Sequence, residues 1–174
     1  MNLSNEIGQI GEKVVSNWFE EHGVQHMRPL YLGVPRLESE ITSKSIQMKK
    51  EKRPYIRGIL KSEMRFVQTI IRDYKSELKT FLSREQFVAF DKFAHEAAKL
   101  PESDRHHGGI DFIAKMPEVA LVEVKANDSH VEKRQRDILA LAKKHGFGAK
   151  VVRVGIEIQI TRDVTFEDFI GASD

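Results

Sequence analysis

Two acidic residues and a lysine lie in two short apolar segments near residue 120, and these are the side-chain types that metal-dependent phosphodiester hydrolysis uses. Asp111 lies in the first segment, and Glu123 and Lys125 lie in the second. Both segments have the β-branched composition of strands. Because side chains alternate along a strand, Glu123 and Lys125 would emerge on the face opposite Val122 and Val124. The spacing therefore permits one shared site.

The same acid–x–Lys spacing occurs again from Asp73 to Lys75 and from Glu77 to Lys79. Both of these triplets fall in a segment expected to be a long helix, where residues two apart point in different directions. Such residues would not readily share a site. The expected strand, rather than the triplet itself, makes Glu123 and Lys125 candidates.

A tight connection between the two strands would bring Asp111 across from Glu123. Two facing carboxylates repel each other, whereas a divalent ion between them stabilises both charged forms. Mg²⁺ is the natural ion, with Mn²⁺ as a substitute, because it takes carboxylate, carbonyl and water oxygens. The carbonyl of Val124 could supply one ligand. Lys125 would neutralise charge that grows on the scissile phosphate, and its alternative role is a simple salt bridge.

The elements expected around these residues form a small mixed sheet. Residues 110–115 and 119–126 predict an antiparallel hairpin. Ile7, Ile10, Val14 and Trp18 recur at helical spacing in the first segment. Periodicity and end signals predict four further elements: a helix over 4–23, a strand over 24–32, a helix over about 129–145 and a strand over 149–160. The order predicts an α/β or α+β fold.

Residues 37–100 interrupt this order with an insertion that is helical in its periodicity. Pro54 divides it into a short basic helix and a long one, and Ser83 with Gln86 forms a capping-box signature for a third helix, which Pro101 ends. The long helix carries one apolar stripe: Ile56, Leu60, Met64, Val67, Ile71, Tyr74, Leu78 and Phe81. Such a stripe must be covered, either within a helical hairpin or in a dimer seam.

Length and composition indicate a single domain over residues 1–174, with 40% hydrophobic and 31% charged residues. No apolar run is long enough to cross a bilayer, and the amino terminus lacks the features of a signal peptide. A cytoplasmic protein is therefore expected. The chain has no cysteine, which excludes disulfides and thiolate metal sites, so any metal must be held by oxygen or imidazole.

The net charge of +2 is small, but its distribution along the chain is uneven. Residues 44–65 hold eight Lys or Arg against two Glu, and residues 133–153 hold seven against one Asp. Solvated helix faces would explain both segments, and so would a surface that holds a polyanion. The candidates for phosphate contact are Lys133, Arg134, Arg136, Lys143 and Lys144, and in the insertion Lys49, Lys50, Lys52, Arg53 and Arg57.

Three segments, GQIGEKVVSNWFEEHG, GGIDFIAK and ALVEVKAND, occur in this order and resemble the PD-(D/E)XK nuclease superfamily. Within it the chain is most similar to the archaeal Holliday-junction resolvases and the small bacterial YraN-like proteins. The resemblance implies a restriction-endonuclease-like core, with Asp111 and Glu123 as metal ligands and Lys125 as the catalytic lysine. The insertion over 37–100 has no counterpart in it.

The resemblance also implies that Glu12 is a helix carboxylate near the metal, acting as a ligand, and that Gln135 is a polar catalytic-site residue beside it. Composition alone would make Glu12 an exposed helix charge. The proline that names the motif is replaced by Ile110, which leaves the carboxylate in place. His106 and His107 could assist as a proton shuttle or extra ligand, or could be a polar loop.

These observations predict a Mg²⁺-dependent endonuclease that is structure-selective or nicking, and the resemblance indicates DNA as its substrate. The insertion is expected to form a clamp or a dimer element. A homodimer through the insertion is a further prediction. Two alternatives stay open. The chain could be a non-catalytic nucleic-acid-binding module with the nuclease fold, or a nuclease subunit of a larger restriction, repair or transposition complex.

Overall fold

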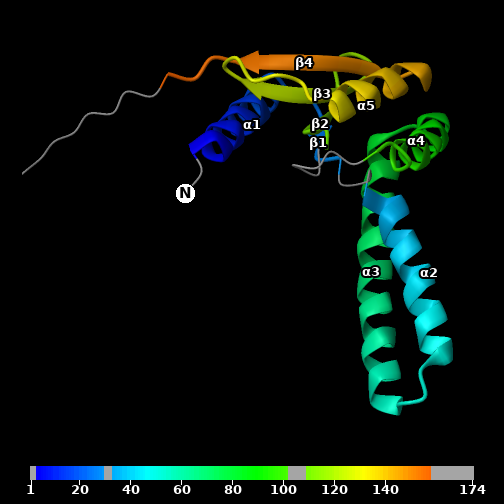
Figure 1. Cartoon of the computed structure of the whole chain (residues 1–174). Helices are drawn as coiled ribbons and strands as arrows, with labels where there is room; N and C mark the ends of the chain where they lie inside the picture. The colour runs from blue at the N-terminus through cyan, green and yellow to red at the C-terminus, as the bar shows by residue number, and fades with distance from the viewer. Residues whose placement is uncertain (1–2, 30–32, 102–108, 158–174) are drawn as a thin grey trace, which may run out of the picture.

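The computed structural model of the chain describes residues 3–29, 33–101 and 109–157, which form a mixed α+β fold. Figure 1 shows a sheet with helices on both sides and a long helical projection. The strands are β1 (His26–Met27), β2 (Phe112–Lys115), β3 (Val119–Ala126) and β4 (Gly148–Val154). The helices are α1 (Leu3–Glu21), α2 (Val34–Lys50), α3 (Pro54–Phe81), α4 (Arg84–Ala97) and α5 (Lys133–Lys144).

The four strands form one mixed sheet in the order β1-β2-β3-β4. β2 and β3 pair antiparallel, with Phe112 opposite Val122, so the predicted hairpin is confirmed. The connection is tight because the N–H of Met116 donates to the carbonyl of Glu118 (2.8 Å). β4 pairs parallel with β3 after the α5 crossover. β3 is therefore flanked by a strand on each side, and seven of its eight residues are buried.

One face of the sheet is covered by α1. Val15 and Phe19 of α1 are buried and belong to one core cluster with Phe112, Val122 and Val124. The helix is confirmed, but its apolar stripe at Ile10, Val14 and Trp18 is 45%, 46% and 47% exposed. The buried face of α1 is thus rotated from the side with the most regular apolar spacing.

Gly11 lies on the side of α1 that meets the sheet. A Cβ atom built on Gly11 would lie 3.5 Å from Cβ of Ala126 and 3.6 Å from Cγ1 of Val124, which are ordinary contact distances. The helix therefore lies next to β3 at this point, and Glu12 is the next residue along it.

The second face of the sheet packs on α4, α5 and the inner end of α3. Ile113 and Leu121 of the sheet are fully buried in a core cluster with Ile138 of α5. Phe90 of α4 meets Phe147 at a ring-centroid distance of 5.5 Å, with the rings nearly perpendicular. α5 is thereby fixed against the face on which Glu123 and Lys125 lie.

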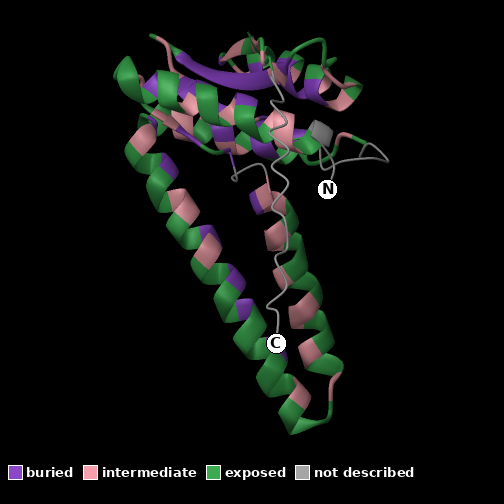
Figure 2. Cartoon of the chain, turned by 90° about the vertical axis from the view of Figure 1, so that its left-hand side faces the viewer, coloured by how far each residue is buried: buried purple, intermediate pink, exposed green. Residues whose placement is uncertain are grey.

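The helices α2 and α3 form a hairpin, here called the arm, that extends away from the sheet (Figure 1). Figure 2 shows that most of the arm surface is exposed and that its buried residues lie along the inside. The predicted apolar stripe is covered within the arm and at its root, where five of its residues are buried: Leu60, Met64, Val67, Ile71 and Leu78. The hairpin interpretation is confirmed, and a homodimer through the insertion stays a prediction.

The capping box that precedes α4 is also confirmed. Ser83 Oγ accepts a hydrogen bond from the backbone N–H of Gln86 (3.2 Å), and Gln86 Oε1 accepts one from the backbone N–H of Ser83 (3.0 Å). Two helix N–H groups thus find partners, and the chain turns sharply between α3 and α4.

Several element boundaries differ from the expectation, and three of them concern the edges of the sheet and its crossover helix. The strand predicted over 24–32 is only β1, with residues 30–32 outside the described part of the chain. α5 begins at Lys133 rather than 129. β4 ends at Val154, where the N–H of Asn127 donates to the carbonyl of Val154, and residues 158–160 lie outside the described part. Among the described residues, no helix combines the length and apolarity needed to cross a membrane.

Candidate active site

Asp111 lies immediately before β2 and closes the ladder between β2 and β3. Its backbone N–H donates to the carbonyl of Val122 (3.2 Å), and its Oδ2 accepts a hydrogen bond from the N–H of Val124 (2.6 Å). The carboxylate therefore takes the place that another strand residue would occupy beside β3. Because Phe112 pairs with Val122, the register continued by one residue places Asp111 across from Glu123, as expected from the sequence.

Glu123 and Lys125 emerge on one face of β3, as the strand period predicts. Glu123 is 1% exposed, and its Oε1 lies 2.8 Å from Nζ of Lys125. The simple salt bridge considered for Lys125 is thus formed. However, Oε2 of Glu123 is buried and has no hydrogen-bond partner among the described residues. An unpaired buried carboxylate oxygen is costly, so the salt bridge alone does not account for this residue.

Gln135, in the first turn of α5, holds the Glu123 carboxylate from the other side. Its Nε2 donates to Glu123 Oε1 (2.6 Å), while its Oε1 accepts from the backbone N–H of Glu132 (3.0 Å). Because a backbone N–H can only donate, this second bond fixes which end of the amide faces Glu123. Gln135 is buried at 7% exposure and acts as a rigid support of the carboxylate.

The two carboxyl groups resist ionisation in this setting. Burial, followed by the nearby negative charge of Glu12, raises the pKa of Asp111 from 3.8 to about 6, although the N–H of Val124 opposes the shift. Burial and the Asp111 carboxylate raise the pKa of Glu123 from 4.5 to about 7, although Lys125 opposes it. A site that keeps two carboxylates close together at low exposure favours either protons or a cation.

Glu12 lies at the edge of this group, but its carboxylate is engaged elsewhere. It forms an ion pair with Arg28, which follows β1, and its side chain is 26% exposed. The Arg28 guanidinium also lies over the ring of Phe112, 4.9 Å from its centroid. Sequence analysis missed Arg28, since an ion pair between two distant segments leaves no local pattern.

The donor set fits a hard divalent cation only in part. Across residues 3–29, 33–101 and 109–157, no group of three or more His, Cys, Asp or Glu side chains is placed to hold a metal ion. Glu12 is the third carboxylate that the resemblance implied. It pairs with Arg28 in this structure, and its role as a ligand stays a prediction.

Two carboxylates and a carbonyl remain as possible ligands. The carbonyl of Val122 points toward Asp111. Because residues two apart in a strand direct their backbone groups to the same side, the carbonyl of Val124 also points toward the Asp111 side of β3. Mg²⁺ is commonly held by one or two carboxylates and keeps several waters. Asp111, Glu123 and Val124 therefore fit this ion, with the unpaired Oε2 of Glu123 as the clearest indication.

The basic residues predicted near the site have several different environments. Arg134 donates to the carbonyls of Leu100 (2.6 Å) and Pro101 (2.8 Å), where it ties α5 to the chain after α4. Arg136 donates to the carbonyl of Val131 (2.7 Å). Lys144 lies 3.5 Å from a Glu96 oxygen, whereas Lys133 and Lys143 are exposed. Phosphate contact stays a prediction, and for Arg134 the structure shows a different use.

The basic residues predicted in the insertion lie at the end of the arm that is far from the sheet (Figure 1). Lys49, Lys50 and Lys52 are exposed there. Arg53 is paired with Glu51 (2.9 Å), and this contact lowers the pKa of Glu51 to about 2. Arg57 lies on the first turns of α3. His106 and His107, the suggested proton shuttle, lie outside the described residues.

No protein-family model, curated protein or solved structure matches the chain. The resemblance to the nuclease superfamily therefore depends on the three sequence segments quoted above. The positions of Asp111, Glu123, Lys125 and Gln135 are separate observations that do not depend on it.

Proposed function

We propose that this protein is a divalent-metal-dependent endonuclease that hydrolyses phosphodiester bonds in DNA, built on a restriction-endonuclease-like core. One observation carries the proposal. Glu123 is buried with an unpaired Oε2 beside a second carboxylate, Asp111, whose pKa is also raised. A carboxylate pair of this kind gains most from a cation, and a cation next to a lysine is suited to phosphate chemistry.

Each residue has a role in this proposal. Asp111 and Glu123, with the carbonyl of Val124, would hold Mg²⁺ or Mn²⁺. The ion would supply Lewis acidity and a lowered pKa for a coordinated water. Lys125, at 14% side-chain exposure, would place its ammonium group where negative charge grows on the phosphate. Gln135 would hold Glu123 in the ligating orientation.

The carboxylate pair argues against one alternative and is equally compatible with the other. A non-catalytic binding module would gain nothing from a buried and a half-buried carboxylate with raised pKa, which weaken folding when they ionise. A nuclease subunit that works only with partners would retain the same residues. That alternative differs from the proposal in assembly rather than in chemistry.

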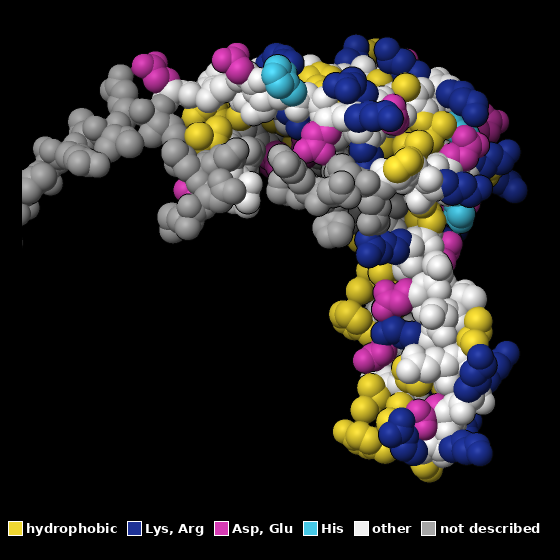
Figure 3. All heavy atoms as spheres, viewed as in Figure 1, with side chains coloured by type: hydrophobic (Ala, Val, Ile, Leu, Met, Phe, Trp, Pro, Cys, Tyr) yellow, Lys and Arg dark blue, Asp and Glu magenta, His cyan; other side chains and the backbone are white. Residues whose placement is uncertain are grey.

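A homodimer through the insertion is also proposed, but it requires a surface other than the buried stripe of α3. Hydrophobic side chains gather along one edge of the arm in Figure 3. Tyr55, Ile59 and Phe66 of α3 are 80%, 41% and 69% exposed. Their spacing of four and seven residues places them on one side of the helix. A second copy of the chain could cover this edge.

The experiment that tests the nuclease proposal is cleavage of supercoiled plasmid and branched DNA in Mg²⁺ or Mn²⁺, with EDTA as the blank. Lys125→Ala is expected to lower the cleavage rate roughly 100-fold to 1000-fold, since one charge-stabilising group is lost. Lys150→Ala is the matched control, because Lys150 is an exposed lysine of the adjacent strand β4. Its rate should equal that of the wild type.

The outcomes separate the three candidates. DNA that survives both ions while still binding the protein would reject the enzyme and favour the binding module. Cleavage that appears only after a cell extract is added, together with a larger particle in gel filtration, would favour the partner-dependent subunit.

A further inference from the structure

One flank of α3 carries a line of positive charge that runs along most of its length. Six of the seven residues at steps of three or four are cationic, with Gln68 in the middle, and such steps keep side chains on one side of a helix. They are Arg57, Lys61, Arg65, Arg72, Lys75 and Lys79. The acidic residues of α3 are Glu63, Asp73 and Glu77. At about 100° per residue they fall on the other flank.

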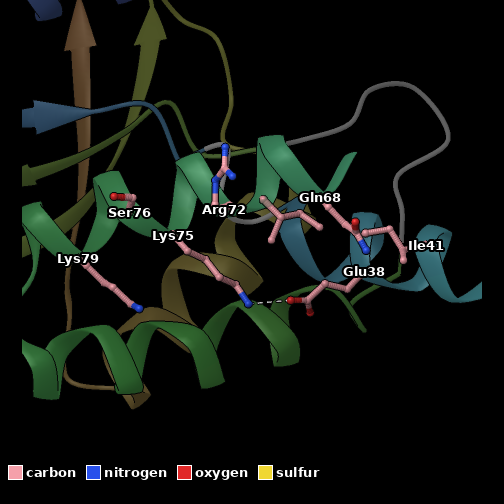
Figure 4. Close-up of a pocket in the computed structure, with 8 residues that line it drawn as sticks. Glu38, Ile41, Gln68, Arg72, Lys75, Ser76 and Lys79 are labelled. Carbon is pink, nitrogen blue, oxygen red and sulfur yellow. Dashed lines mark hydrogen bonds and ion pairs between the residues drawn. The ribbon is translucent and has the colours of Figure 1, made fainter. Parts of the chain in front are cut away.

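The basic flank borders a groove between α2 and α3. Two hollows of about 430 and 510 Å³ lie along it, and both are lined by Gln68, so they adjoin. Figure 4 shows the one nearer the sheet, where Arg72, Lys75 and Lys79 of α3 line the space with Glu38 of α2. The groove is therefore elongated and follows the helix axis.

The outer half of the groove has uncompensated positive charge. It is lined by Arg57, Lys61 and Arg65, with Met48, Met64 and Gly58, and none of its lining residues is acidic. Within the described residues, no ion pair engages the side chains of these three cations. Arg57, Lys61 and Arg65 are all exposed, so their charged groups are available to an external anion.

The inner half is partly compensated. Lys75 lies 2.7 Å from Glu38, and Arg72 lies 3.2 Å from Asp73. Both pairs are solvent-accessible, and accessible ion pairs contribute little free energy, so an incoming phosphate can replace the carboxylate. The groove thus becomes more strongly basic from its inner end to its outer end.

The other flank of the arm has the opposite arrangement. Lys44 of α2 lies 2.7 Å from Glu63 of α3 and 3.1 Å from Glu40, and these contacts raise its pKa. Charge on that flank is balanced across the two helices. The excess of cations therefore belongs to the groove and is not a general property of a lysine-rich hairpin.

We propose that this groove binds the sugar–phosphate backbone of a nucleic acid duplex, which is DNA if the proposed nuclease function holds. A line of separate cations fits a polyanion, whereas a single small anion would require cations that converge. From Arg57 to Lys79 the line spans roughly 33 Å at about 1.5 Å per residue, close to one turn of duplex DNA, about 34 Å. Arginine and lysine are also the usual partners of backbone phosphates.

The test compares two triple variants with the same loss of charge. Arg57→Gln, Lys61→Gln and Arg65→Gln remove the outer cations of the groove. Arg84→Gln, Lys92→Gln and Lys99→Gln remove three exposed cations on or just after α4. Binding of a labelled 30-base-pair duplex is followed by fluorescence anisotropy in EDTA, so that no cleavage occurs, over a range of salt concentrations. Circular dichroism checks that both variants keep their helices.

The groove variant should bind at least tenfold more weakly at low salt. The slope of log affinity against log salt should fall by about 2.7, since each lost phosphate contact removes about 0.9. The α4 variant should keep the wild-type slope. Equal slopes for the groove variant and the wild type would overturn the proposal, as would equal losses in both variants. Tighter binding of poly-glutamate than of DNA at these residues would overturn it in favour of an acidic protein.

The result is independent of the nuclease proposal. If the wild type never cleaves DNA but the groove variant loses binding, the nuclease fails and the groove stands. If the groove variant binds DNA normally while Lys125→Ala abolishes cleavage, the groove fails and the nuclease stands.

Discussion

The sheet and the arm use charged residues in opposite ways. At the end of the β2–β3 hairpin, Asp111 and Glu123 lie within the fold and are held by Val124 N–H, Lys125 and Gln135. On the arm, Arg57, Lys61 and Arg65 are exposed, and no ion pair engages them among the described residues. The first group is held by these contacts at low exposure, which raises the pKa of both carboxyls, whereas the second is exposed to solvent.

This difference indicates a division of labour. Carboxylates held by hydrogen bonds and ion pairs suit chemistry that needs defined positions, because these contacts prevent them from moving away. Exposed cations suit a long ligand that is recognised by charge alone, since each contact is weak and replaceable. A polyanion held by the arm and cut at the sheet would use both regions.

The largest expected effect is at the carboxylate pair. Asp111→Asn and Glu123→Gln should each lower the cleavage rate about 1000-fold, because each removes a ligand charge from the proposed metal site. Asp128→Asn, an exposed acid just after β3, should leave the rate unchanged. Plasmid nicking under single-turnover conditions measures all three. Equal losses at Asp128 would erase the distinction between buried and exposed charge.

The second effect concerns stability against pH in the absence of metal. Folding raises the pKa of Glu123 from 4.5 to about 7, so the folded state prefers the protonated form. The stabilisation is present at pH values below 4.5 and is lost as the pH rises through 7. The free energy of unfolding should fall by on the order of 3 kcal/mol over this range.

Urea unfolding at a series of pH values measures this fall. In Glu123→Gln the part of the fall that comes from Glu123 should disappear, while the part that comes from the raised pKa of Asp111 remains. Mg²⁺ should restore stability in the wild type above pH 7 but not near pH 5, where protons compete with it. A wild type and a Gln variant with the same pH dependence would show that Glu123 is not under electrostatic strain.

The third effect distinguishes Gln135, which supports a proposed ligand, from the ligand Glu123 itself. Gln135→Met keeps the shape of the side chain but removes the hydrogen bond to Glu123 Oε1. Loss of such a support is expected to weaken metal affinity or activity about 10-fold to 100-fold. Mn²⁺ affinity is the readout, because a purely structural role for Gln135 would lower stability without changing it. An unchanged affinity would remove Gln135 from the site.

The smallest expected effect concerns Arg134, a basic residue whose hydrogen bonds stabilise the fold. Arg134→Ala should lower the free energy of unfolding by about 2 kcal/mol, since two charge-assisted hydrogen bonds to Leu100 and Pro101 are lost. Lys133→Ala, its exposed neighbour, should change it by less than about 0.5 kcal/mol. If instead Arg134→Ala is fully stable and lowers the salt slope of DNA binding, the residue is a phosphate contact.

The arrangement of the site was predictable where local geometry leaves little choice. Strand side chains alternate, so Glu123 and Lys125 had to share a face, and the short turn at Met116 fixed the register that places Asp111 opposite Glu123. The capping box at Ser83 and the buried stripe of α3 were predictable for the same reason, because their patterns are complete within a few turns.

Other features depend on contacts between distant segments. The side of α1 that meets β3 includes Gly11, Val15 and Phe19, and a glycine adds nothing to an apolar pattern. The regular stripe through Trp18 therefore pointed to the wrong side. The ion pair of Glu12 with Arg28 joins α1 to the end of β1. The basic groove needs both helices of the arm, since α2 supplies one wall.

Calorimetric titration with Mn²⁺ at pH 6.5, in two buffers of different ionisation enthalpy, tests the central claim most directly. The wild type should bind the ion at a site formed by Asp111 and Glu123 and release protons, because both carboxyls have pKa values near this pH. Asp111→Asn and Glu123→Gln should each abolish that binding. Identical heats in the wild type and in both variants would contradict the account.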